Sequence, residues 1–391
     1  MIRSFLAAVL LLSCLSTAFA QQLPQDANSQ LLITHGDFRP PASDDLNPKA
    51  LHDQAIIFTE LSRYREARHY YLRELGARTR RGEMVEVARV YGELGALSQI
   101  EGAFSSAEVL YKKSIALFIR CAGPPDLQTA KVLNELGWLY TLWGRMDDAS
   151  EMLRKAQKVA QNALPEDSPE LIRYLDFNAA FLTQAGKYAE AEKLWRRAIE
   201  IGERAWGPDS PRYDFVRIHL GQMYAIIGDY DAAEQIFQHC LAIERNLIQT
   251  GSTAQAMLLA ELASVHAHRR QFARAEPLFA ESLKFIESET DRTPSVHALI
   301  VSYYGDYFMA QRRWSDAQLQ YQRALDIREK MMADSPTVAA SLIALSQALR
   351  KQGRKKEAKQ LMARAAMIMA SQPAAAYNSK TVDVRAFRAA K

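Results

Sequence analysis

The stretch Gly186-Lys187-Tyr188-Ala189-Glu190-Ala191-Glu192-Lys193-Leu194 decides the fold, because its pattern returns along most of the chain. Taking Ala191 as an anchor, an alanine recurs at intervals of 40, 42, 42, 42, 42, 42 and 41 residues. The eight anchors are Ala67, Ala107, Ala149, Ala191, Ala233, Ala275, Ala317 and Ala358. A fixed period of this size indicates a stack of repeated supersecondary units.

The position five residues before each anchor predicts a tight turn. Glycine fills it in five units, at Gly102, Gly144, Gly186, Gly228 and Gly353. Glycine reaches the left-handed backbone conformation that commonly ends a helix. Arg270 and Arg312 replace it in two units and Ser62 in the first, so we expect strained or differently shaped turns there.

Small and large residues alternate at fixed distances from the anchor. Twelve residues before it the side chain is always small: Ala55, Gly95, Gly137, Ala179, Gly221, Ala263, Gly305 and Ser346. Four residues after it the side chain is large: Tyr71, Tyr111, Leu153, Trp195, Phe237, Phe279, Tyr321 and Met362. Such spacing predicts two amphipathic helices per unit that pack knob into hollow. An aromatic cofactor pocket is the alternative, but recurrence in every unit favours packing.

These features resemble the tetratricopeptide repeat. Here the period is 42 residues, longer than the common 34. Together with loops such as Gly207-Pro208-Asp209-Ser210-Pro211, it resembles the kinesin-light-chain type. The resemblance covers about residues 47–370. It implies an all-α fold, a right-handed α-solenoid of about eight antiparallel helix pairs, and a protein that binds other proteins.

The first twenty residues have the pattern of a secretory signal peptide. Arg3 precedes an apolar run, and Ala18-Phe19-Ala20 resembles a cleavage site. Leu11-Leu12-Ser13-Cys14 loosely resembles a bacterial lipobox, which leaves lipidation of Cys14 open. We therefore expect export to the periplasm of a Gram-negative bacterium, with a lipid anchor as the alternative. Polar composition predicts a flexible leader at 21–46 and a flexible basic tail at 371–391.

The bulk properties exclude several classes of function. Without Arg3 the chain carries 48 basic and 45 acidic residues, too balanced to favour nucleic acid. After the leader no stretch is apolar enough to span a membrane. Cys121 and Cys240 lie about three repeats apart, so we expect two small packing residues rather than a disulfide.

The resemblance implies that the first helices line a concave surface. Eighteen residues before the anchors stand Arg89, Lys131 and Arg173, followed by Phe215, Met257 and Leu299. The nearby face carries Asn134, Trp138, Asp176, His219, Gln222, Tyr303 and Asp306. We expect these residues to be exposed, with a basic first half and a more apolar second half. Three cations in register suit an acidic or C-terminal carboxylate group of an extended peptide, and Trp138 suits an anchor. An ordinary solvated helix face remains the alternative.

No motif of a hydrolase, nucleotide-binding enzyme or zinc protease is present. His266 and His268 point in different directions on a helix, so we expect no metal site and no cofactor. The sequence thus predicts a non-catalytic interaction scaffold or adaptor. A spacer in a larger envelope assembly is the alternative, and an enzyme is less favoured. In the last unit Lys355 and its basic neighbours predict a polar cap, with an anion-binding patch as the alternative.

Overall fold

The computed structural model describes residues 47–61, 63–122, 126–247, 252–287, 294–331 and 335–371. The predicted signal peptide with Cys14, the leader at 21–46 and residues 372–391 of the tail lie outside this part of the chain. Within the described residues the chain forms α-helices and one short 3-10 helix, and no strand. None of these helices combines the length and hydropathy needed to cross a membrane.

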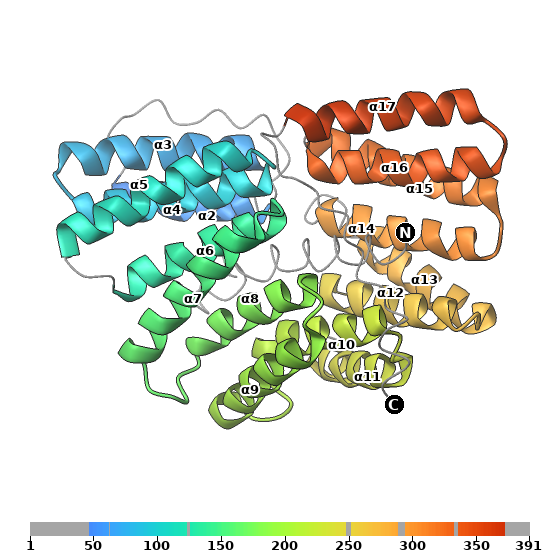
Figure 1. Ribbon diagram of the computed structural model, residues 1–391, viewed down its shortest axis with the longest axis horizontal. Helices are drawn as coiled ribbons and strands as arrows, with labels where there is room; N and C mark the ends of the chain where they lie inside the picture. Colours follow the sequence, from blue (N-terminus) through green and yellow to red (C-terminus); the bar gives the residue numbers. More distant parts are fainter. Residues whose placement is uncertain are drawn as a thin grey trace.

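The helices form eight antiparallel pairs, one pair for each predicted unit (Figure 1). The pairs are α2 (Pro48–Glu60) with α3 (Tyr64–Arg80), α4 (Met84–Ile100) with α5 (Phe104–Ala122), α6 (Leu127–Leu142) with α7 (Met146–Ala163), α8 (Leu171–Gln184) with α9 (Tyr188–Trp206), α10 (Asp214–Ile227) with α11 (Tyr230–Leu247), α12 (Thr253–His268) with α13 (Phe272–Glu287), α14 (Pro294–Ala310) with α15 (Trp314–Met331), and α16 (Pro336–Lys351) with α17 (Lys355–Ser371). The 3-10 helix η2 (Pro211–Tyr213) precedes α10. The predicted all-α solenoid is confirmed.

The turns inside the pairs have the predicted backbone conformation. Glycine adopts a positive φ at Gly102 (73°), Gly144 (74°), Gly186 (76°), Gly228 (89°) and Gly353 (84°). Arg270 and Arg312 keep the same left-handed conformation, with φ of 59° and 62°. A residue with a Cβ costs roughly 1–2 kcal/mol there, so these two turns are strained as expected. Ser62 lies outside the described residues.

Each pair is closed by a small residue on the first helix that meets a large one on the second. A Cβ added to Gly221 would lie 2.7 Å from the ring of Phe237. The same close approach joins Gly95 with Tyr111, Gly137 with Leu153, and Gly305 with Tyr321. The anchor alanines are at most 1% exposed. The knob-into-hollow packing predicted from the spacing is confirmed.

The two cysteines differ in their surroundings. Cys240 is fully buried in α11, as expected of a packing residue. The expectation is wrong for Cys121, which is exposed. It stands in the last turn of α5, so its position at the helix end removes it from the packed stripe.

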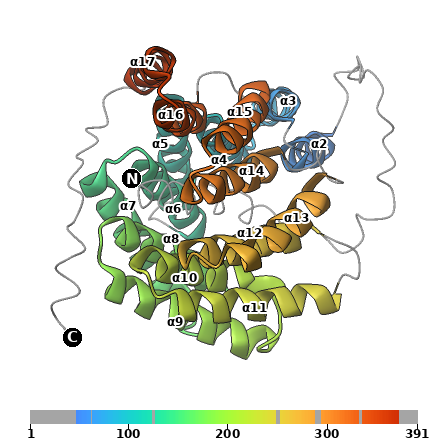
Figure 2. The same cartoon turned by 90° about the vertical axis from the view of Figure 1, so that its right-hand side faces the viewer.

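The array curls until its two ends meet. Figures 1 and 2 show the first pairs, in blue, beside the last pairs, in red. Gly102, in the turn between α4 and α5, lies against the start of α16. A Cβ there would stand 2.6 Å from Cδ of Pro336. The inner face of the first helices is therefore surrounded by the array.

The glycine hollows give a direct test of the packing. Gly221→Ala places a methyl group against Phe237, so we expect the free energy of unfolding to fall by about 1–3 kcal/mol. Gly76→Ala is the matched control, because a Cβ there meets only the end of Arg80 at 3.6 Å. In α3 that change should stabilise by about 0.5–1 kcal/mol. Urea denaturation of both variants measures the difference, and equal effects would contradict this packing.

Candidate functional site

The inner face of the array is built from direct contacts between successive first helices. α6 contacts α8, α8 contacts α10, and α12 contacts α14. Asp176 on α8 links three helices, because it lies 2.8 Å from Nδ1 of His219 on α10 and accepts a 2.8 Å bond from Nε1 of Trp195 on α9. Polar residues on this face therefore bond to one another across neighbouring units.

A second cluster continues the pattern further along. Glu261 on α12 accepts hydrogen bonds from Nε2 of Gln222 at 2.7 Å and from the hydroxyl of Tyr303 at 3.1 Å. Burial raises the pKa of Glu261 to about 7, and this effect outweighs the two hydrogen bonds, which lower the pKa. Asp306 accepts a 2.5 Å bond from the hydroxyl of Tyr321, and burial also raises its pKa to about 7. Both carboxyls lack a cationic partner within hydrogen-bond distance among the described residues.

The expectation of an exposed concave face is wrong for most of the predicted residues. Seven have little accessible surface: Asn134 (1%), Trp138 (1%), Asp176 (2%), His219 (1%), Gln222 (1%), Leu299 (2%) and Tyr303 (3%). Asp306 is half-buried. The physical reason is the close approach of successive first helices, whose side chains fill the space between them. The role of these residues in binding stays a prediction.

Four of the predicted residues lie around one cavity on the inner face of the first units. This inner cavity has a volume of about 290 Å³. Its lining includes Arg89, Glu93, Lys131, Glu135, Trp138 and Arg173. The side chains of Arg89 and Arg173 are 46% and 37% exposed, so their guanidinium groups stay within reach of water. The predicted row of three cations and its aromatic neighbour therefore meet at one place.

The cavity carries both signs of charge. Arg173 forms an ion pair with Glu135 at 2.6 Å, and Arg89 pairs with Glu86. Lys131 is exposed and forms no ion pair with any described residue. The half-buried Glu93 has a raised pKa, chiefly because burial disfavours its charged form.

The sequence interpretation missed Glu93 and Glu135. Each stands four residues after a predicted cation, Arg89 or Lys131, and therefore on the same helical face. That spacing was the signal that could have found them. The row that was predicted to be basic therefore carries both positive and negative side chains.

Several buried polar atoms on α6 and α8 have no partner among the described residues, and one of them belongs to Trp138, which lines the cavity. Both amide atoms of Asn134, the indole nitrogen of Trp138 and the hydroxyl of Tyr174 make no hydrogen bond. Asn134 stands one helical turn before Trp138 on α6. A buried polar atom without a partner costs free energy, so each of these atoms would gain from one further hydrogen bond.

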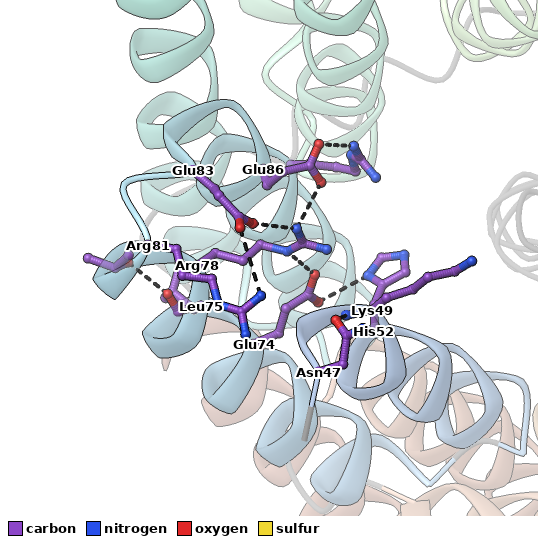
Figure 3. A network of polar contacts seen from close by, with 11 residues as sticks. Asn47, Lys49, His52, Glu74, Leu75, Arg78, Arg81, Glu83 and Glu86 are labelled. Carbon is purple, nitrogen blue, oxygen red and sulfur yellow. Dashed lines mark hydrogen bonds and ion pairs between the residues drawn. The ribbon is translucent and has the colours of Figure 1, made fainter. Parts of the chain in front are cut away.

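One edge of the cavity is held by a polar network in the first units (Figure 3). Glu74, only 1% exposed, lies 3.0 Å from Nδ1 of His52 and 2.6 Å from Nε of Arg78. Arg78 also lies 3.5 Å from Glu86, the partner of Arg89. The bond to Glu74 raises the pKa of His52. The buried carboxylate of Glu74 is thus held between the side chains of His52 and Arg78.

No group of three or more His, Cys, Asp or Glu residues in the described part of the chain is arranged to hold a metal ion. The two histidines of α12 have separate partners. Nδ1 of His266 lies 2.9 Å from the side-chain oxygen of Gln271, and Nδ1 of His268 lies 2.7 Å from the carbonyl oxygen of Ser264.

Comparison with known proteins agrees with this architecture. Tetratricopeptide repeat models match residues 86–162 and 171–246, and a further one matches 338–366. The chain is therefore a tetratricopeptide repeat protein. No curated protein matches it in sequence.

Solved structures show the same fold at low identity. A Rap protein complexed with competence and sporulation factor has a TM-score of 0.55 and 12% identity, over 83% of this chain and 99% of that one. The Rap conjugation regulator of plasmid pLS20, in complex with the Phr* peptide, has a TM-score of 0.53 and 13% identity over 87% and 80%. A kinesin-light-chain-like protein of Podosopora anserina has 16% identity over 64% and 100%, with a TM-score of 0.34. That score is too low to assign the kinesin-light-chain type, which stays a prediction.

The raised pKa of Glu261 predicts a pH dependence of stability. The pKa of this carboxyl is about 7 in the folded protein and 4.5 for an ordinary glutamate, so its contribution to folding is fully present below pH 4.5. That contribution is lost as the pH rises through 7. Glu261→Gln stays neutral, so the wild type should lose up to about 3 kcal/mol more than the variant between about pH 5 and pH 8. Urea denaturation at both pH values measures this difference. Asp306 also has a raised pKa, but it is present in both proteins, so its contribution to the pH dependence cancels. Parallel losses would contradict the assignment.

Proposed function

We propose that this protein is a non-catalytic adaptor that binds an extended segment of another protein in the inner cavity. The observation that carries the proposal is the convergence of Arg89, Lys131, Arg173 and Trp138 on one cavity. A stacked array presents such a surface over several units, so it suits an extended chain better than a compact ligand.

The chemistry of the cavity suits a peptide that bears a carboxylate. Lys131 supplies a cation without an internal partner, and the two arginines lie on either side along the row. Trp138 lines the cavity, and its indole nitrogen is a hydrogen-bond donor without a partner among the described residues. Glu135 keeps Arg173 in place through its ion pair, which also discourages a cationic ligand.

The Rap structures support the proposal at the level of the fold. Two of these neighbours were solved with competence and sporulation factor or with the Phr* peptide. At 12–13% identity the likeness concerns architecture, so the choice of partner rests on this chain's own residues.

We also propose that the adaptor works in the cell envelope. The support is the order of charge, apolar run and cleavage-like site in residues 1–20. Fractionation of the source cells, followed by mass determination of the mature protein, tests this. Processing before Gln21 supports periplasmic release, processing with a lipid on Cys14 supports an anchor, and an unprocessed cytoplasmic chain contradicts both.

The binding proposal is tested with an array of ten-residue peptides of varied sequence, each made with a free C-terminal carboxylate and with an amide cap. We expect acidic or free-carboxylate peptides to bind, and Lys131→Glu to weaken that binding at least about tenfold. Affinity of the best peptide is then measured by fluorescence anisotropy at several salt concentrations.

Lys193→Glu is the matched control, because this lysine is also exposed but lies on α9. It should leave the affinity within about twofold of the wild type. Equal binding by wild type and Lys131→Glu, or no preference for peptides with a carboxylate, would contradict the proposal that the inner cavity binds the peptide.

A further inference from the structure

The inner cavity contains a carboxyl group that has no partner. Glu93 lines the cavity from α4 and is half-buried. Its side chain forms no hydrogen bond or ion pair with any described residue. The other acidic residue of the lining, Glu135, is bound to Arg173 at 2.6 Å. Glu93 is therefore the acidic group of this cavity whose charge no neighbour balances at short range.

The repeat places these two carboxyl groups close together. Glu93 and Glu135 stand at equivalent positions of successive units, fourteen residues before the anchors Ala107 and Ala149. Their helices, α4 and α6, contact each other. The equivalent residue of the next unit is Phe177, which also lines the cavity but carries no charge. Two like charges thus meet at one place on the inner face, where each disfavours the charged form of the other.

Several other charged or titratable groups line the cavity with Glu93. They are His52 on α2, Arg89 on α4, Tyr111 on α5, Lys131 and Glu135 on α6, and Arg173 on α8. Arg89 pairs with Glu86, and the hydroxyl of Tyr111 donates to Gln99 at 3.2 Å. His52 lies 3.0 Å from Glu74 (Figure 3). Lys131 has no such partner among the described residues, so it is the cation open to a ligand.

A ligand carboxylate changes the balance of charge in the cavity. When it binds at Lys131, it becomes a third acidic group beside Glu93 and Glu135. Carboxyl groups that share a partly buried site cannot all ionise without a large cost, so one of them takes up a proton. Glu93 is the group that gains most from neutralisation, because no cation is bound to it.

We propose that Glu93 is the pH-sensitive group of the inner cavity and takes up a proton when a carboxylate-bearing peptide binds, an inference that rests on the proposed function. One proton moves from solvent to a carboxylate oxygen of Glu93, and no other bond changes. Binding and protonation then favour each other, because the coupling between two binding equilibria is reciprocal. The affinity for such a peptide therefore rises as the pH falls.

The surroundings of Glu93 already favour its neutral form. Burial raises its pKa, and so does Glu135, although three nearby cationic groups oppose this rise. A bound carboxylate adds a further negative charge, so the pKa of Glu93 is higher in the complex than in the free protein. The affinity is then highest below the pKa of the free protein. It decreases as the pH rises towards the pKa of the complex, and it is constant above that value.

His52 acts in the same direction as Glu93. The bond to Glu74 raises the pKa of His52, and the protonated ring attracts an anion. A rise in affinity at low pH therefore does not identify Glu93 alone. The test has to compare two proteins that both contain His52, so that its contribution cancels from the ratio of their affinities.

Anisotropy titrations of the full chain with one probe provide this comparison. The probe is the ten-residue peptide with a free C-terminal carboxylate that binds most tightly. Glu93→Gln keeps the shape of the side chain and is always neutral, so it should bind this peptide at least about fivefold more tightly than the wild type at pH 8. The two affinities should converge towards pH 5, because Glu93 then becomes neutral in the wild type as well.

Glu135→Gln is the matched control, because Glu135 lines the same cavity at the equivalent position but is bound to Arg173. This variant retains Glu93, so its affinity should still rise towards pH 5. Calorimetry in two buffers of different ionisation enthalpy measures the proton uptake directly, and Glu93→Gln should take up less than the wild type. Circular dichroism checks that both variants stay helical.

The outcomes separate this inference from the proposed function. If the ratio of affinities of Glu93→Gln and wild type is the same at pH 8 and pH 5, Glu93 is not the pH-sensitive group, while the carboxylate site stands. A wild-type affinity that falls towards pH 5 would also overturn the inference, because Glu93 would then pair with a cation of the ligand. If Lys131→Glu binds as tightly as the wild type, the proposed function fails and this inference fails with it.

Discussion

The contact between a small residue on one helix and a large residue on the next is the constraint on which this structure depends. Where Gly221 faces Phe237, or Gly305 faces Tyr321, an added methyl group would already overlap the ring. Such contacts fix the distance between the two helices and the point along each helix at which they lie closest. Because the contact repeats every 42 residues or so, small offsets between units add up in one direction. The curl of the array follows from this repetition.

The curl in turn determines the chemistry of the inner face. Successive first helices converge there, so side chains that would be separate on a flat array meet in pairs such as Asp176 with His219. Burial then raises the pKa of Glu261, which has only neutral hydrogen-bond donors. The same convergence brings the ends together, with Gly102 against Pro336. The exposure of a polar residue therefore depends both on its position along its helix and on the position of that helix in the curled array.

This explains what could be predicted from the sequence. Repeat length, turn glycines and the anchor alanines are local signals, and even the strained turns at Arg270 and Arg312 followed from them. Helical periodicity also identified the face that carries Lys131 and Trp138. It could not give their exposure, since exposure depends on the angle between neighbouring units, which no single period encodes. Cys121 shows the converse, because a residue with apolar character became exposed at a helix end.

The mixed charges of the inner cavity have a consequence for how a ligand would bind. The ion pair between Arg173 and Glu135 is partly exposed, so it contributes at most about 1 kcal/mol to stability. Under the proposed function, a ligand carboxylate would therefore replace Glu135 at Arg173 with little loss of stability. Displaced Glu135 would then lie beside Lys131, four residues before it on α6. Charge in this cavity can thus be exchanged without leaving an unpaired group, which favours selection among partners over tight binding to one.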